Sequence, residues 1–162
     1  MIDERWRCVE AAAHTGEKFQ YKTCGLDDIF LLNGYKHVTT SEGEGIAIAD
    51  IDDLHRAIGK HLATQKKQLS GKELRFLRKQ MDLTQAEVGR FIGLGSQQVA
   101  RWEKDQSCIS GPADYLIRKL YLEHINGKLS LRELVEELDD SDSTNEEEQV
   151  FKKTDGEWRA VA

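Results

Sequence analysis

Residues 84–103 read TQAEVGRFIGLGSQQVARWE, and this stretch decides the fold expected for the middle of the chain. Thr84 stands three residues before Glu87, so the two residues can satisfy the free amides at the start of a helix reciprocally. Gly89 keeps the backbone small where a second helix must cross closely. Apolar residues recur at helical spacing and give the helix one buried face: Val88, Phe91 and Ile92. The pattern predicts a helix that ends at the glycines of the sequence GLG.

A second helix is expected to begin at Ser96, which we predict to be its N-cap. Val99 and Trp102 lie three residues apart and are its predicted buried positions. Glutamine can bind adenine bidentately, and arginine can fork onto the O6 and N7 atoms of guanine. An amphipathic hairpin with solvated polar side chains is the alternative, but caps, glycines and apolar positions agree on a helix-turn-helix. The predicted DNA-binding side chains of this helix are Ser96, Gln97, Gln98, Arg101 and Lys104.

The segment from Gly71 to Leu122 extends the pattern on both sides. It contains ELRFLRKQMDLTQAEVGRFIGLGSQQVARWEK and then GPADYLIRKLY, and it resembles the Cro/C1-type (XRE) helix-turn-helix family. The resemblance implies an all-α, five-helix, lambda-repressor-like domain that binds double-stranded DNA. We expect this domain over residues 66–140, with helices at residues 72–81, 85–92, 96–104, 112–124 and 130–138.

Charge is distributed unevenly along the chain. The net charge is −6, yet residues 66–104 hold nine Lys or Arg against four Asp or Glu, and residues 126–162 hold five against eleven. Lys72 and Arg78 precede the motif and are predicted to contact phosphates beside the groove, with a solvated basic face as the alternative. Gln85 begins the first motif helix and is placed for a phosphate contact or for bracing the recognition helix.

The first 65 residues are expected to form a small β-rich domain with one helix, so the predicted fold class is α+β. Asn33-Gly34 lies between two strand-like segments of residues 29–40 and predicts a hairpin. A further strand is predicted over residues 45–49, followed by a helix over residues 51–63 that Asp50 can cap. The sheet is expected to be held by apolar packing of Phe19, Tyr21, Ile29, Leu31, Ile46 and Ile48.

In order and size, these N-terminal residues are similar to the zinc ribbon that precedes the XRE domain in MqsA-type antitoxins. That family holds zinc with two CxxC pairs, whereas here Tyr21 replaces the first cysteine before Cys24 and the second pair is missing near GIAIAD. Four soft ligands cannot be assembled at the usual spacing. We therefore predict a degenerate ribbon without metal or other cofactor. Irregular convergence of four donors is the alternative: Cys8, His14, Cys24 and His37.

The chain is not expected to be an enzyme. The cluster Asp50, Asp52, Asp53 and His55 could be interpreted as a hard-metal or acid–base site. A cap with acids in the first helical turn explains the same residues more simply, because the helix dipole favours negative charge there. The sequence also has no nucleophile elbow, phosphate loop or paired metal motif.

Composition limits the class of protein. With 162 residues and 39% hydrophobic content, the chain can hold two small domains with real cores. No apolar run approaches the length of a membrane span, and the start, MIDERWRC, is unlike a signal peptide. Three cysteines, an odd number, fit reduced thiols better than disulfides. We therefore expect a cytoplasmic protein without a membrane partner.

Residues 141–162 are predicted to form an acidic linker and a C-terminal hairpin around Asp155-Gly156. A lone two-stranded hairpin is marginal in water, so we expect it to dock on another surface or to be disordered. Its candidate docking surfaces are the β-rich domain, a dimer mate or a partner protein.

The helix expected over residues 112–124 bears more apolar side chains than one buried stripe requires: Tyr115, Leu116, Ile117, Leu120, Tyr121, Leu122 and, just beyond, Ile125. The surplus predicts a homodimer on a palindromic operator, with a thicker monomeric core as the alternative. We expect a transcriptional repressor. The MqsA resemblance implies an antitoxin that also binds a toxin protein and represses their shared operon. A stand-alone repressor from a phage or mobile element, using its N-terminal domain for dimerisation or ligand sensing, is the alternative.

Overall fold

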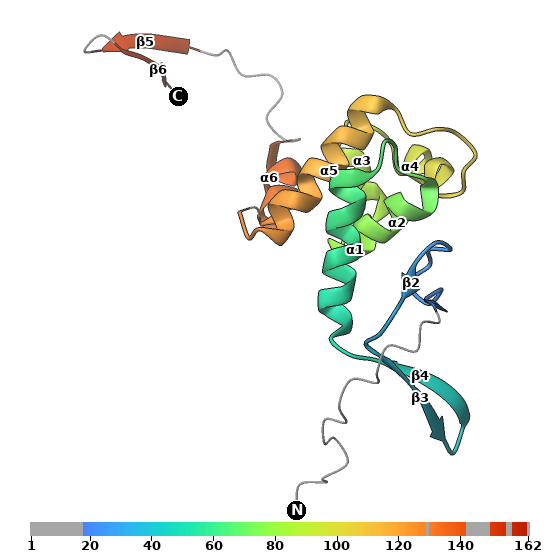
Figure 1. The fold of residues 1–162 in the computed structure, drawn as a ribbon. Helices are drawn as coiled ribbons and strands as arrows, with labels where there is room; N and C mark the ends of the chain where they lie inside the picture. The colour runs from blue at the N-terminus through green and yellow to red at the C-terminus, as the bar shows by residue number, and fades with distance from the viewer. Residues whose placement is uncertain (1–17, 129, 142–149, 155–156, 162) are drawn as a thin grey trace, which may run out of the picture. The chain divides into compact units, whose positions relative to one another are not determined.

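The structure is a computed structural model that describes residues 18–128, 130–141, 150–154 and 157–161. The chain divides into two compact units, residues 1–128 and 129–162. The described part of the first unit contains β1 (Phe19–Gln20), β2 (Phe30–Leu31), β3 (Tyr35–Thr40), β4 (Gly43–Ile48), α1 (Ile51–Gln65), α2 (Gly71–Gln80), α3 (Gln85–Phe91), α4 (Ser96–Glu103) and α5 (Gly111–Ile125) (Figure 1). The described part of the second contains α6 (Leu131–Ser141), β5 (Val150–Thr154) and β6 (Glu157–Val161).

A helix is present at each predicted position. Helices α2 to α5 lie in the first unit together with α1, whereas α6 belongs to the second unit. Within the first unit, α1 packs on α2 and α5. The described structure is a mixture of helices and small antiparallel sheets, so the α+β composition is confirmed.

Two capping boxes set the starts of α2 and α3. The amide of Glu73 donates to the Ser70 hydroxyl, and the amide of Ser70 donates to the Glu73 carboxylate. Thr84 and Glu87 make the same reciprocal pair, as the sequence predicted. Each pair satisfies two amides that have no partner within the helix. The starts of these two helices are therefore determined locally.

The turn between α3 and α4 requires two glycines. A Cβ added at Gly89 would lie 2.5 Å from the carbonyl oxygen of Leu94, so only glycine allows this close approach of the backbone. Gly93 has a φ of +69°, a left-handed conformation that glycine adopts without strain. The predicted capping role of Ser96 is wrong: Gly95 is the N-cap, and Ser96 is the first residue of α4.

The core of the helical part lies among α2, α3, α4 and α5, where large apolar side chains are almost fully buried: Leu74, Leu77, Val88, Val99, Trp102 and Ile117. Helix α1 joins it through a close contact with α5. A Cβ added at Gly59 would lie 2.0 Å from the hydroxyl oxygen of Tyr121, a side chain that is only 1% exposed. The missing side chain at position 59 thus lets the two helices meet.

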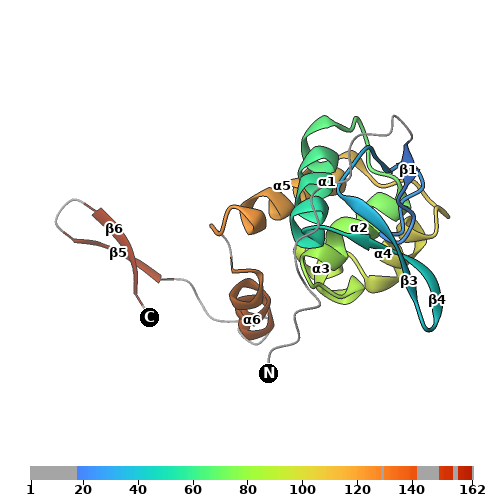
Figure 2. The ribbon, with the colours of Figure 1, turned by 60° about the horizontal axis from the view of Figure 1, so that its bottom comes forward.

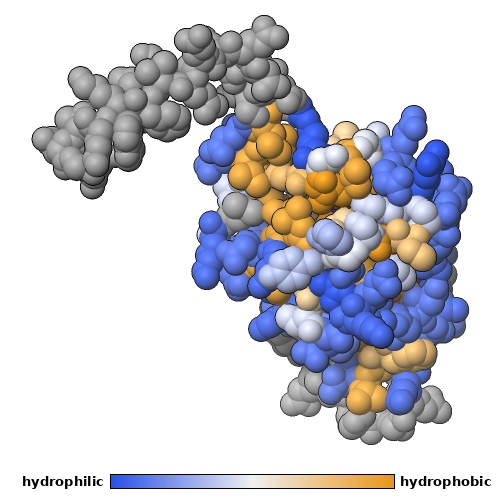
Figure 3. Space-filling view, turned by 90° about the horizontal axis from the view of Figure 1, so that it is seen from above, coloured by the Kyte–Doolittle hydropathy of each residue, from blue (hydrophilic) through white to orange (hydrophobic). Residues whose placement is uncertain are grey.

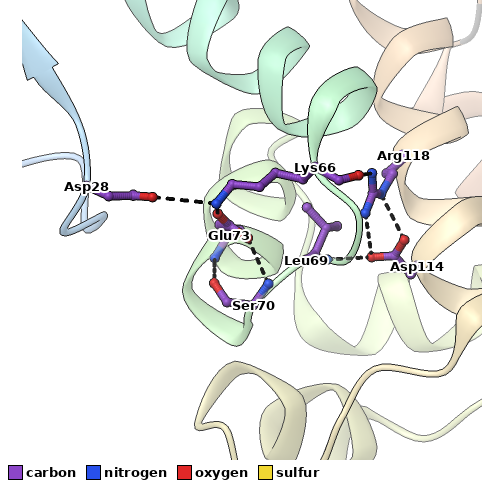
Figure 4. A network of polar contacts seen from close by, with 7 residues as sticks. All are labelled: Asp28, Lys66, Leu69, Ser70, Glu73, Asp114 and Arg118. Atoms are coloured by element: carbon purple, nitrogen blue, oxygen red, sulfur yellow. Dashed lines mark hydrogen bonds and ion pairs between the residues drawn. The ribbon is translucent and has the colours of Figure 1, made fainter.

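A polar network joins the α1–α2 connection to α5 (Figure 4). Asp114 accepts the amide of Leu69 at 2.8 Å and forms an ion pair with Arg118, which also donates to the Lys66 carbonyl. The Lys66 ammonium lies 2.9 Å from the buried Glu73 carboxylate. Burial strengthens such charge-assisted bonds because little water competes for them. The network therefore links α1 to the helices of the DNA-binding motif.

The N-terminal residues differ from the predicted sheet. The hairpin expected at Asn33-Gly34 is wrong: β2 pairs with β1, and β3 pairs with β4 across a turn at residues 41–42. Two separate two-stranded ribbons result, and Figure 2 shows the β3–β4 ribbon extending away from the helices. Of the six side chains expected to hold this region, Tyr21 and Leu31 are buried, and the others are half-buried.

The helix expected after these strands is present as α1, and its N-cap is at the predicted residue. Asp50 is the N-cap residue in a left-handed conformation, and its side chain makes no capping hydrogen bond. In the second unit, β5 and β6 pair as the predicted two-residue hairpin, with Thr154 opposite Glu157.

Candidate nucleic-acid interface

Helix α4 separates its buried side chains from its polar ones. Val99 and Trp102 are 0% and 3% exposed, so they anchor the helix in the core. The outward side chains lie in solvent: Ser96, Gln97, Arg101 and Lys104. The prediction that Val99 and Trp102 are buried and that Gln97, Arg101 and Lys104 are exposed is therefore confirmed.

The outward side chains differ in what they already bind. Gln98 is half-buried, and its amide nitrogen lies 3.2 Å from the hydroxyl of Ser107 in the following loop. Within the described residues, Gln97, Arg101 and Lys104 have no side-chain hydrogen bond or ion pair. Their donors and acceptors are thus available to a ligand, and one glutamine and one arginine lie a helical turn apart.

Arg78 is not placed as an open phosphate contact. Its guanidinium donates from Nε to Glu103 Oε1 at 2.5 Å, from Nη2 to Glu103 Oε2 at 3.1 Å, and from Nη1 to the Leu83 carbonyl at 2.7 Å. The Arg78 and Glu103 side chains are only 12% and 4% exposed. Because its donors are used inside the domain, this arginine braces α2 against α4 rather than standing free as the sequence suggested.

Gln85 belongs to the same brace. Its side-chain amide donates to Glu103 Oε2 at 2.8 Å, so the start of α3 is tied to the end of α4. Of the two roles expected for Gln85, the structure favours bracing. Glu103 was not predicted from the sequence as a site residue. The available signal was an acid within a basic segment, directly after the buried Trp102.

Lys72 is exposed but already paired. Its ammonium binds the carboxylate of Asp27, which comes from the loop between β1 and β2. The hydrogen bond with Lys72 lowers the pKa of Asp27, and the same bond raises the pKa of Lys72. A phosphate would therefore have to compete with Asp27 for this lysine. Such exposed pairs are weak because water and salt screen them.

The residues at the zinc-ribbon positions do not fit a metal. Tyr21 occupies the place of the first cysteine, and its hydroxyl shares a 2.9 Å hydrogen bond with His55 Nε2. The Cys24 thiol points to the backbone carbonyl of Tyr21. Among the described residues, no three His, Cys, Asp or Glu side chains converge. Cys8 and His14, two of the four donors in the alternative, lie outside the described residues.

The arrangement of α3, a glycine turn and an exposed α4 defines a helix-turn-helix, a class of motif that binds DNA. In agreement, residues 74–113 match the family model described as Helix-turn-helix. Residues 74–113 are therefore similar to XRE-type helix-turn-helix domains, which are found in DNA-binding transcription regulators. Comparisons with curated proteins and with solved structures found no match for the chain. In the part of the chain that the structure describes, no helix combines the length and apolar character needed to cross a membrane.

Proposed function

We propose that this protein is a sequence-specific transcriptional repressor that reads a DNA operator with α4. The observation that carries the proposal is the exposed pair Gln97 and Arg101, one turn apart on a helix whose other face is buried. Glutamine and arginine are the side chains that read adenine and guanine in the major groove. Lys104 extends the same face and can bind an adjacent phosphate.

The brace around Glu103 supports this role because it holds the reading helix in place. Base readout requires side chains to be positioned within a fraction of an ångström. Two donors from different helices bind the carboxylate at the end of α4, and Trp102 beside it is buried. Residues 85 and 78 thus act in positioning, and we assign direct DNA contact to Gln97, Arg101 and Lys104, with Ser96 and Gln98 at the edge of the contact.

We further propose that the protein binds a palindromic operator as a homodimer through α5. Tyr115 and Leu116 are 64% and 37% exposed on that helix, and apolar surface of this kind is what a symmetric contact buries. Figure 3 shows apolar side chains, in orange, gathered on the face of the molecule that it draws. Two copies would present two reading helices to two half-sites.

An antitoxin setting is the more specific proposal, and a stand-alone phage or mobile-element repressor is the alternative. The N-terminal strands and loops expose three large apolar side chains, Phe30 at 51%, Leu32 at 46% and Val38 at 36%. Exposed apolar side chains of this size offer contacts to a protein partner such as a toxin. A toxin-like reading frame adjoining this gene would support the antitoxin, and its absence would support the alternative.

Selection of duplexes from a random pool tests the central proposal. The selected duplex and a scrambled one are then titrated with the purified full chain over a range of salt concentrations. We expect a clear preference for the selected duplex and an affinity that falls steeply with salt, because phosphate contacts release counterions. A chain that enriches no sequence would overturn the proposal.

A matched pair of variants identifies the reading helix. Gln97→Ala combined with Arg101→Ala is expected to abolish the preference while the thermal unfolding curve stays unchanged, because both side chains are exposed. Arg56→Ala, which removes an exposed arginine from α1, is the control and should keep the preference. If the Gln97/Arg101 variant kept the same preference for the selected duplex as the Arg56→Ala control, α4 would not be the helix that reads the bases.

A further inference from the structure

A cavity lies between the turn after β1 and the outer face of α2. Its volume is about 510 Å³, and its walls come from Thr23, Cys24 and Gly25 on one side and from α2 on the other, with His55 of α1 between them. Pockets of about 300–1,000 Å³ are the size that holds whole small molecules. Neither the DNA-binding motif nor the resemblance to a zinc ribbon explains this space.

The α2 wall of the cavity is basic. Lys72, Arg75 and Lys79 line it and recur at the spacing of one helical face. Arg75 and Lys79 are exposed, and within the described residues neither side chain has a hydrogen bond or an ion pair. Two cations held side by side without a counter-charge repel each other, so a bound anion would stabilise them.

Two carboxylates near this wall, Glu103 and Asp27, already have cationic partners. Glu103 also lines the cavity, but its two oxygens accept three hydrogen bonds from Arg78 and Gln85. Asp27 is bound to Lys72. The cavity therefore keeps an excess of positive charge from Arg75 and Lys79.

We propose that this cavity binds a small molecule carrying two or more phosphate groups. The Arg75 guanidinium can fork onto two oxygens of one phosphate, and the Lys79 ammonium acts as a point charge beside it. Lys72 becomes a third contact when the anion displaces Asp27. A single phosphate would fill only a small part of the space, so the ligand class is a diphosphate or a larger organic phosphate.

A DNA backbone phosphate carries the same chemistry, and the geometry favours the small molecule. The turn at Thr23–Gly25 faces α2 across the cavity, so the basic side chains line a recess with two walls. A duplex presents its phosphates along a continuous backbone and binds best to an open basic surface. Binding of pyrophosphate and binding of DNA duplexes, measured on the same variants, distinguish a small phosphate ligand from a DNA backbone phosphate.

Isothermal titration of the full chain with pyrophosphate at low ionic strength is the test. We expect saturable binding with one site per chain. The combined variant Arg75→Gln with Lys79→Gln should bind about tenfold more weakly or worse, since it removes both uncompensated charges. Lys60→Gln, which removes an exposed lysine of α1, is the matched control and should bind like the wild type.

A gain-of-binding variant keeps the test independent of folding. Asp27→Asn frees Lys72 and is expected to tighten pyrophosphate binding several-fold, whereas a folding defect could only weaken it. Absence of saturable binding by the wild type, or equal binding by the Arg75/Lys79 variant, would overturn the proposal. The proposal would also be overturned if the wild type did not bind pyrophosphate and the Arg75/Lys79 variant bound every duplex more weakly than the wild type. In that case the two cations would bind DNA phosphates. Titration with pyrophosphate needs no operator, so its outcome is separate from that of the repressor proposal.

Discussion

Arg78 of α2 and Glu103 of α4 form a bidentate ion pair, in which Arg78 Nε lies 2.5 Å from Glu103 Oε1 and Arg78 Nη2 lies 3.1 Å from Glu103 Oε2. Both side chains are largely buried, and Gln85 of α3 donates to the same carboxylate. Helix α2 and the two helices of the helix-turn-helix therefore meet at one acid. The pair joins α2 to the end of the reading helix α4, so its loss should affect stability before it affects DNA contact.

Glu103→Ala is expected to lower the free energy of unfolding by about 3–5 kcal/mol, because it leaves the largely buried Arg78 guanidinium without the carboxylate that balances its charge, with only the Leu83 carbonyl still accepting from it. Urea denaturation at neutral pH measures the change. The double variant Arg78→Met with Glu103→Leu removes both charges and should recover most of the loss. A Glu103→Ala protein within about 0.5 kcal/mol of the wild type would show that the pair is not a brace.

Arg101→Ala is expected to weaken binding to the selected operator by about 1–3 kcal/mol and to relax discrimination at one base pair. The reason is that the exposed guanidinium is available for a bidentate contact with guanine. Titrations on the operator and on single-base-changed duplexes at fixed salt measure both effects. Full affinity and full discrimination in the variant would exclude Arg101 from base readout.

Leu116→Glu is expected to convert the proposed dimer into a monomer without unfolding it. The side chain is 37% exposed on α5, so a charge there disturbs an intermolecular contact more than the core. Light scattering measures the mass, and Ile51→Glu, at an exposed apolar position of α1, is the control. Tyr121, another of the apolar residues from which the dimer was predicted, is buried against Gly59, so its replacement by a charge would test folding instead. A wild type that is monomeric at every concentration would contradict the dimer.

Stability should fall at alkaline pH, and Tyr121 should contribute to the fall. Burial raises the pKa of Tyr121, although the nearby Arg56 acts in the opposite direction. The unfolded chain ionises this tyrosine near pH 10, whereas the folded chain keeps it protonated to higher pH. Its stabilising contribution is therefore fully present below about pH 10 and is lost as the pH rises through the folded-state pKa.

Urea denaturation of Tyr121→Phe between pH 8 and pH 11 measures this contribution. The variant should lose less stability across the range than the wild type does. Tyr115→Phe removes an exposed hydroxyl from the same helix and is the matched control. Parallel curves for Tyr121→Phe and the wild type would contradict the prediction.

The helices of the motif were predictable because their signals are local. The capping pair Thr84 and Glu87 lies within one helical turn, and the conformational demand on Gly93 comes from the turn itself. The same is true of the C-terminal hairpin, whose two-residue loop sets the pairing of β5 with β6. Sequence spacing is sufficient when the interacting groups are close along the chain.

The strand pairing near the N-terminus was not predictable from turn chemistry alone. Asn33-Gly34 has the residues of a tight hairpin, but β2 pairs with β1. Gly34 is instead used in a loop, where its carbonyl accepts the amide of Ala49 after β4. Tyr21, just after β1, and Leu31 of β2 are buried in the observed arrangement. Pairing between segments distant along the chain is not contained in a local turn pattern.

By itself, the sequence determined the helix-turn-helix, the Thr84 cap of its first helix, its glycine turn and the outward face that bears Gln97 and Arg101. The tertiary structure decided which charged residues remain available. Arg78, Lys72 and Arg101 are all cations in one basic segment, yet the first is buried on Glu103, the second is bound to Asp27, and the third is exposed without a described partner. The partners lie 25 residues from Arg78 and 45 residues from Lys72 along the chain. Periodicity shows which face of a helix a residue occupies, but only folding brings a distant carboxylate within hydrogen-bonding distance of it.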